Sequence, residues 1–140
     1  MKMALKNERF TIHGDGSAKR EWIYVGDNCE AILTVMERGT DGEIYNITTN
    51  NELTNLEVVR LVHKVTGKPN NFYDFVADRP GQDRRYSVDP KKIRDLGWTP
   101  KMTLEKFLPT LLEMNMMRNA ARKPGKTEKL LRTLRLKRTK

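Results

Sequence analysis

Three arginines gather around a turn in the segment VADRPGQDRRYSVD, residues 76–89. Arg79 comes just before the dipeptide Pro80-Gly81, which is a strong turn signal. Arg84 and Arg85 come shortly after it. A guanidinium group is planar, permanently charged and able to donate two parallel hydrogen bonds, which suits phosphate oxygens. The spacing is therefore typical of an anion-binding loop, and the alternative is a solvated surface loop that carries three charges.

Helices and strands must hold this loop in place, and the apolar spacing predicts where they lie. Asp27 and Thr54 each precede a segment with apolar residues at helical spacing, and both residue types commonly cap helices. Short runs rich in β-branched and aromatic residues are typical of strands. We expect strands at residues 10–13, 22–25, 43–48 and 72–76, and helices at residues 28–38, 55–66, 90–96, 104–117 and 128–137.

The net charge of +9 is concentrated at one end of the 140-residue chain. Residues 117–140 contain ten Lys or Arg and a single acid, Glu128, so the first 116 residues are neutral overall. The length fits one globular body, residues 1–116, and the charge marks a separate basic tail, residues 117–140. The tail residues that we expect to bind a polyanionic or acidic partner are Arg118, Arg122, Lys126, Lys129, Arg132, Arg135 and Arg138.

The basic tail also carries an apolar stripe. Leu130, Leu131 and Leu134 fall on one side of the helix expected at residues 128–137, and basic residues surround them. Such a helix can lie on RNA phosphates, on an anionic membrane or in the groove of an acidic protein. The tail has no aromatic side chain for base stacking, so an RNA contact would involve the backbone only. The alternative is a disordered, solvated tail.

The cysteine and histidine content excludes several kinds of site. Cys29 is the only cysteine, which rules out an internal disulfide and a cysteine metal cluster and fits a reducing compartment. His63 is expected on the surface of its helix and not as a ligand. No apolar run approaches the ~20 residues that span a bilayer. The first ten residues lack the apolar region of a secretory signal, so we expect a cytoplasmic or organellar-matrix protein that is not secreted.

Four segments, in order along the chain, carry a family resemblance: IHGDGSAKREWIYVGD, GEIYNITTNNELTNLEVV, VADRPGQDRRYSVD and LGWTPKMTLEKFLPTLLEM. Together they resemble the C-terminal part of dTDP-glucose 4,6-dehydratases, which are extended short-chain dehydrogenases/reductases of the NAD-dependent epimerase/dehydratase family. The resemblance covers nearly all of residues 1–115. It implies an α/β fold, the C-terminal substrate-binding portion of such an enzyme, followed here by the basic helical tail.

The resemblance begins inside the family pattern and implies that the N-terminal Rossmann half is missing. That half holds the NAD pyrophosphate with a Gly-rich turn at a helix N-terminus, and the family carries a Tyr-x-x-x-Lys pair for proton and hydride chemistry. Here Gly14-Asp15-Gly16 is only G-x-G, and Lys19 stands where a third glycine is needed. No tyrosine is followed by lysine four residues later. We therefore expect no catalytic residue, no NAD and no metal in this chain.

By motif position, the resemblance implies three contacts to the diphosphate of a dTDP-sugar. These are Arg20 in KREW, Asn46 in YNI and Arg79 in ADRPG. Two arginines and an amide suit a pyrophosphate, because a hydrogen bond to a charged group contributes ~1.5–3 kcal/mol. In the alternative interpretation the arginines are structural and pair with nearby carboxylates, namely Asp78, Asp83 and Asp89.

The chain departs from the family pattern at several positions near this site. Gln82 replaces the usual histidine of the DRPGHD pattern. Thr48-Thr49 replaces a Gly-Gly pair and adds side chains where backbone would approach a ligand. His13 stands where an aromatic residue commonly lies beside the base. These departures favour a relic over a working ligand site.

Two functions fit these observations. In the first, the chain is a non-catalytic dehydratase-like fragment recruited as a structural subunit of a larger assembly, such as an organellar ribosome or another ribonucleoprotein. In the alternative, it is the nucleotide-sugar-binding half of a split or truncated dTDP-glucose 4,6-dehydratase. The departures, the missing half and the tail favour the first function, and the DRPGQDRRY loop favours the second.

A protein partner is expected in either case. Without the nucleotide-binding half, apolar faces formed by Ile32, Val35, Ile44 and Ile47 would lose part of their cover. Exposed apolar patches and open strand edges usually mark an interaction surface. The alternative is that a shortened domain packs these side chains internally.

Overall fold

The computed structural model describes residues 1–121 and has an α/β fold, as expected. Its helices are α1 Lys2–Lys6, α2 Val25–Arg38, α3 Asn55–Thr66, α4 Lys91–Asp95 and α5 Leu104–Ala121, and its strands are β1 Phe10–His13, β2 Lys19–Glu21, β3 Glu52–Thr54 and β4 Tyr73–Val76. The helix expected at residues 128–137 lies outside the described residues.

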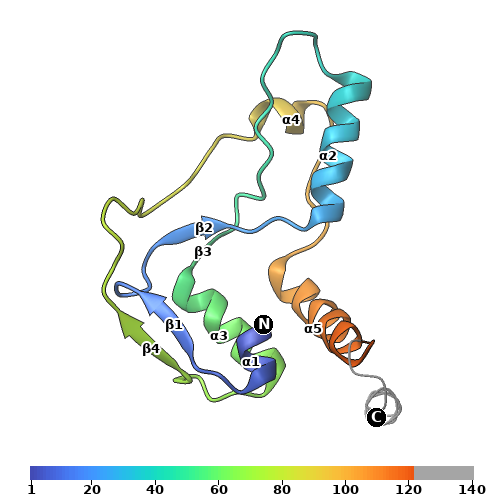
Figure 1. Ribbon diagram of the computed structural model, residues 1–140. Helices are drawn as coiled ribbons and strands as arrows, with labels where there is room; N and C mark the ends of the chain where they lie inside the picture. The colour runs from blue at the N-terminus through green and yellow to red at the C-terminus, as the bar shows by residue number, and fades with distance from the viewer. Residues whose placement is uncertain (122–140) are drawn as a thin grey trace.

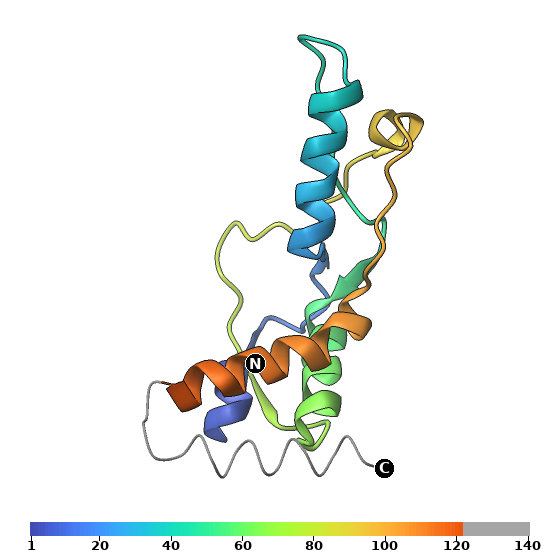
Figure 2. The ribbon, with the colours of Figure 1, turned by 90° about the vertical axis from the view of Figure 1, so that its right-hand side faces the viewer.

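The strands form two separate pairs. β1 and β4 are parallel, with Phe10 opposite Tyr73. β2 and β3 are antiparallel, with Glu21 opposite Glu52. Figures 1 and 2 show an extended arrangement in which α2, α4 and the loop of residues 39–50 form one end, and α1, α3, α5, β1 and β4 form the other. Residues 77–89 run past β2 on the way from β4 to α4 (Figure 1).

The sequence defines α3 at both ends, and the helix expected at residues 55–66 is confirmed. The hydroxyl of Thr54 accepts a hydrogen bond from the amide of Glu57 at 3.1 Å, and the Glu57 carboxylate accepts one from the Thr54 amide at 2.7 Å. This capping box satisfies two amides at the start of the helix. Gly67 ends the helix with φ 68°, a left-handed conformation that glycine adopts without a Cβ clash.

The first core joins α1, α3 and α5. Ala4, Val62 and Leu108 are its buried members. His63, which we expected on the helix surface, is fully buried beside this core, so that expectation is wrong. Its ring lies 4.9 Å from the ring of Phe10 and is nearly parallel to that of Tyr73. Neither ring nitrogen has a hydrogen-bond partner among residues 1–121, and burial lowers the pKa of His63.

The second core joins α2 to α4 and to the chain before α5. Ala31, Ile93 and Trp98 are its buried members. α2 begins at Val25, so Asp27 lies inside its first turn and does not precede the helix as expected. The buried Asp27 carboxylate accepts the amides of Lys101 and Met102 at 3.0 and 2.9 Å. Asp27 therefore fastens α2 to the chain that leads into α5.

Two of the expected strands do not form. Residues 22–25 follow β2 and then enter α2, because strand pairing involves the preceding residues Lys19–Glu21. Residues 43–48 have no strand partner among the described residues and form an irregular segment. Side chains hold this segment instead: the Tyr45 hydroxyl accepts the Thr40 amide at 2.9 Å, and Glu43 forms an ion pair with Lys92. The expected strands at residues 10–13 and 72–76 are confirmed, the second as Tyr73–Val76.

An apolar stripe faces outward from α2. Val25, Ile32, Leu33 and Met36 are all exposed, as is Ile44 on the loop that follows. By contrast, Val35 and Ile47 pack against the second core, so the expectation of uncovered side chains holds only in part. In the part of the chain that the structure describes, no helix is both long enough and apolar enough to cross a membrane.

Candidate anion-binding site

A backbone hydrogen bond holds the segment of residues 77–89 beside β2, and another holds the residue just before the segment beside the end of β1. The Gly14 amide donates to the Val76 carbonyl at 3.0 Å, and the Lys19 amide donates to the Arg84 carbonyl at 2.8 Å. The turn predicted at Pro80-Gly81 is present: Gly81 has φ 71°, and the Gln82 amide donates to the Arg79 carbonyl at 3.3 Å. The segment therefore brings its arginines beside β1 and β2.

Arg20 extends from β2 toward this segment. Its guanidinium donates to the carbonyl oxygens of Lys19 at 2.6 Å and Asp83 at 2.8 Å. The guanidinium carbon also lies 4.3 Å from the centre of the Tyr86 ring, a distance typical of a cation–π contact. A guanidinium has five N–H donors. Three of those on Arg20 therefore have no protein acceptor among residues 1–121.

Arg79 lies at the other end of the same segment. One of its terminal nitrogens is 3.4 Å from Nε2 of His13, and this is its side chain's one hydrogen-bond contact among the described residues. Neither Arg20 nor Arg79 forms an ion pair with Asp78, Asp83 or Asp89 within residues 1–121. The interpretation of these two arginines as structural partners of carboxylates therefore gains no support.

The side chain of Asn46 bonds to the protein backbone near α4. Its amide nitrogen donates to the carbonyl of Asp89 at 3.2 Å and so fixes the segment before α4. The three predicted site residues do not line a single pocket. Arg20 lines a pocket of 240 Å³, whereas His13, the contact of Arg79, lines a second pocket of 200 Å³.

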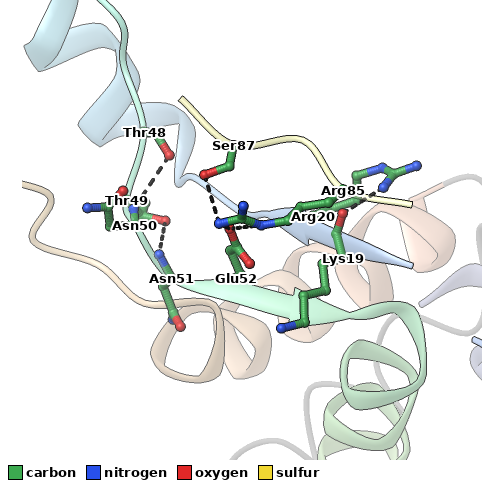
Figure 3. A network of polar contacts seen from close by, with 9 residues as sticks. All are labelled: Lys19, Arg20, Thr48, Thr49, Asn50, Asn51, Glu52, Arg85 and Ser87. Atoms are coloured by element: carbon green, nitrogen blue, oxygen red, sulfur yellow. Dashed lines mark hydrogen bonds and ion pairs between the residues drawn. The ribbon is translucent and has the colours of Figure 1, made fainter. Parts of the chain in front are cut away.

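The 240 Å³ pocket contains residues that motif matching did not assign. Besides Arg20, its polar and aromatic lining consists of Glu21, Thr48, Thr49, Tyr86 and Ser87. Tyr86 directly follows Arg84 and Arg85 in the sequence, and an aromatic residue beside several arginines is a signal that could have indicated stacking. Thr48 and Thr49 accept the amides of Asn50 and Asn51 (Figure 3), so the two threonines stabilise an irregular loop.

Arg85 contrasts with Arg20 and Arg79 because it has a carboxylate partner. Its Nε donates to Glu52 at 2.8 Å, and it also donates to the Ser87 hydroxyl at 3.2 Å (Figure 3). The Arg85 guanidinium holds the pKa of Glu52 below its usual value, chiefly through their hydrogen bond. Glu21, opposite Glu52, has a raised pKa because of burial and, second, the Glu52 charge. The charge of Arg85 is thus neutralised by a carboxylate of the protein.

The turn Gly14-Asp15-Gly16 does not fit the pyrophosphate of NAD. It connects β1 to β2, and no helix begins at its end. A Cβ at Gly16 would lie 3.0 Å from Ile12 and 3.2 Å from Leu56, so glycine is needed there for packing. A Cβ at Gly14 would lie 2.9 Å from the Asp78 carboxylate, whose charge would repel a phosphate. No NAD-binding residue is assigned in this chain.

The basic residues predicted to bind a partner lie almost entirely outside the described part. Arg118 is exposed on α5, and its guanidinium donates to the Asn115 side chain at 3.4 Å. The others, Arg122, Lys126, Lys129, Arg132, Arg135 and Arg138, are beyond residue 121. Their contact with RNA, a membrane or an acidic protein stays a prediction.

Comparison with protein families gives a match over most of the chain. Residues 1–111 match the family model of GDP-mannose 4,6 dehydratase. The chain is 43% identical over 112 residues to a dTDP-glucose 4,6-dehydratase of Xanthomonas campestris pv. campestris, an alignment that covers 73% of this chain and 32% of that protein. It is 41% identical over 110 residues to the low-salt glycan biosynthesis protein Agl12 of Haloferax volcanii, and that alignment covers 79% of this chain and 36% of that protein.

Solved structures give the same result. The dTDP-glucose 4,6-dehydratase DesIV of Streptomyces venezuelae, with NAD and TYD bound, matches with a TM-score of 0.76 and 34% identity, over 85% of this chain and 37% of that one. The resemblance expected from the four motifs is therefore confirmed. The chain spans about a third of the length of these relatives. None of these three is described as a ribonucleoprotein subunit, so that function gains no support.

Proposed function

This chain belongs to the GDP-mannose 4,6-dehydratase family, and from that membership we propose that it supplies the diphosphate-binding part of a dTDP-glucose 4,6-dehydratase. The observation that carries the proposal is the state of two arginines. Arg20 bonds to the segment of residues 77–89 and Arg79 belongs to it, yet neither is neutralised by a carboxylate among residues 1–121. Unneutralised guanidinium groups at the edge of a pocket suit a phosphate ligand.

The charges around the site favour an anion over a neutral sugar. Arg85 is paired with Glu52, so its charge is already compensated. Arg84 lines the 200 Å³ pocket and, like Arg20 and Arg79, makes no ion pair in the described part of the chain. The carboxylates of Asp15, Asp78 and Asp83 line the same pocket as Arg84, so we place the phosphate groups beside Arg20 and Arg79 and not among these carboxylates. In this proposal each contact to phosphate contributes about 1.5–3 kcal/mol.

Substrate binding and catalysis are separate in this proposal. The 140 residues contain no Tyr-x-x-x-Lys sequence, and the Gly14-Asp15-Gly16 turn does not suit NAD. We therefore assign binding and orientation of the nucleotide sugar to this chain, and no proton or hydride transfer. Incubation of the pure chain with NAD and dTDP-glucose is expected to give no 4-keto-6-deoxy product. Formation of that product would show that catalytic residues have been overlooked.

We also propose that the apolar stripe on α2 contacts the part of the family fold that these residues do not represent. The stripe consists of Val25, Ile32, Leu33 and Met36, and the relatives are about three times as long as the matched region. Co-expression with the first two thirds of the Xanthomonas relative should give a complex that Ile32→Glu with Met36→Glu disrupts. Equal co-purification of the variant would exclude this face as the contact.

Calorimetric titration of the complete chain with dTDP and with thymidine tests the diphosphate proposal. dTDP should bind, because it brings a diphosphate to Arg20 and Arg79, and thymidine should bind far more weakly. The affinity for dTDP should also fall with added salt, because exposed charge interactions are screened. Equal affinities for dTDP and thymidine, or no binding of dTDP, would refute the proposed function.

A further inference from the structure

We infer that Tyr86 is a positioning residue that keeps the Arg20 guanidinium available for a diphosphate, an inference that rests on the proposed function. Tyr86 belongs to neither core and is 56% exposed, so packing does not account for its place. It lines the same 240 Å³ pocket as Arg20. Its ring and its hydroxyl each make one contact that bears on Arg20.

The ring lies against the guanidinium of Arg20. The distance from the guanidinium carbon to the ring centre is 4.3 Å. Two backbone carbonyls, of Lys19 and Asp83, accept hydrogen bonds from the same guanidinium. Together the ring and the two carbonyls restrict a long, flexible side chain before any ligand arrives. Such preorganisation raises affinity because less conformational freedom is lost on binding.

The hydroxyl of Tyr86 binds the carboxylate of Asp83, which could compete with a phosphate for Arg20. It donates to the Asp83 carboxylate at 2.6 Å. Arg20 meanwhile bonds to the Asp83 carbonyl and forms no ion pair with the carboxylate of that residue within residues 1–121. An ion pair between Arg20 and Asp83 would neutralise the guanidinium and oppose phosphate binding. Tyr86 thus occupies the carboxylate of the residue whose carbonyl already holds Arg20, a carboxylate that could otherwise take the place of the ligand.

The protonation of Tyr86 supports this arrangement. The hydrogen bond to Asp83 and then the charge of Asp83 raise the pKa of the Tyr86 hydroxyl above its usual value of 10.0. The hydroxyl therefore remains a donor throughout the physiological range.

Affinity for dTDP and for thymidine in a set of variants of the complete chain tests the inference. Tyr86→Phe keeps the ring but releases the Asp83 carboxylate, so it should weaken dTDP binding by about two- to tenfold, the effect of one hydrogen bond. Tyr86→Leu removes both contacts and should weaken it further. Asp83→Asn should restore dTDP affinity in the Tyr86→Phe background, because the amide cannot form an ion pair with Arg20. Thymidine affinity should not change.

A double-mutant cycle with Arg20→Ala separates positioning from direct contact. If Tyr86 acts through Arg20, Tyr86→Leu should cause no further loss of dTDP affinity in the Arg20→Ala background. A further loss of the full size, or a matching loss of thymidine affinity, would overturn the inference. So would wild-type affinity of both Tyr86 variants, although the proposed function would then stand. Absence of dTDP binding by the wild-type chain would overturn both.

Discussion

The helix starts beside the two packed cores differ from the segment of residues 77–89 in how their polar side chains are paired. At the starts of α3 and α2, polar side chains find protein partners: Thr54 and Glu57 bond to each other, and Asp27 accepts two amides. Along the segment, Arg79 and Arg84 make no ion pair among residues 1–121, nor does the neighbouring Arg20. The difference indicates that the cores serve stability, whereas the segment retains charge for a ligand.

The largest expected effect on stability comes from the second core. Trp98 is buried, and its indole nitrogen donates to the Asp27 carbonyl at 3.1 Å. Trp98→Ala should lower the free energy of unfolding by about 3–5 kcal/mol, because it leaves a cavity between α2 and α4. Urea denaturation measures this loss. Met36→Ala, on the exposed face of the same helix, is the control and should change it by less than about 0.5 kcal/mol. Equal losses would mean that α2 is not packed as described.

A smaller effect is expected at the start of α3. Thr54→Ala removes the hydroxyl that accepts the Glu57 amide, and it should lower the free energy of unfolding by about 0.5–2 kcal/mol. Thr54→Ser keeps the hydroxyl and should remain close to the wild type. If the two variants were equally destabilised, the capping box would not be the cause. Neither variant should change the affinity for dTDP, since Thr54 belongs to the part of the molecule that serves stability.

The buried His63 gives the first core a dependence on pH. Burial lowers its pKa below the usual value of 6.5, so the folded chain favours the neutral ring. The stabilisation is therefore complete above about pH 6.5 and is lost as the pH falls below it, because the unfolded chain then binds a proton that the folded chain does not. The wild type should lose more stability than His63→Leu between pH 7 and 5, measured by urea denaturation. An equal loss of unfolding free energy between pH 7 and 5 in the wild type and in His63→Leu would contradict this account.

The smallest effect on stability is expected from breaking the ion pair of Arg85 and Glu52. Arg85 is largely exposed, and exposed ion pairs contribute little to stability. Arg85→Met should shift the urea midpoint only slightly, and less at high salt than at low salt, because salt screens the pair. Glu52→Gln is the matched variant and should behave alike. A large, salt-independent loss would show that this pair is part of a core.

The sequence predicts those parts of the fold that depend on neighbouring residues. Thr54, Glu57 and Gly67 define α3 from signals within a few residues of its ends. The strand expected at residues 43–48 is absent because a strand needs a partner, which local sequence does not identify. His63 lies four residues after Val59 and seven after Leu56, so its place on the apolar stripe could have revealed its burial.

The candidate site also has parts that local sequence predicts and parts that depend on tertiary structure. Motif position indicates Arg20 and Arg79, and the dipeptide Pro80-Gly81 predicts the turn that the structure contains. The contact of Tyr86 with Arg20 joins residues 66 positions apart in the sequence, so spacing alone could not predict it. Which arginine is neutralised is also a matter of tertiary structure: Arg85 meets Glu52, which lies 33 residues before it.

One calorimetric measurement tests the contrast between neutralised and unneutralised arginines most directly. It is the dissociation constant of dTDP for the wild type, Arg79→Ala and Arg85→Ala under one set of salt and pH conditions. Arg79→Ala should weaken binding by about 1.5–3 kcal/mol, which is roughly ten- to 150-fold, whereas Arg85→Ala should stay close to the wild type. An equal loss in both variants, or an Arg79→Ala variant that binds like the wild type, would contradict the account.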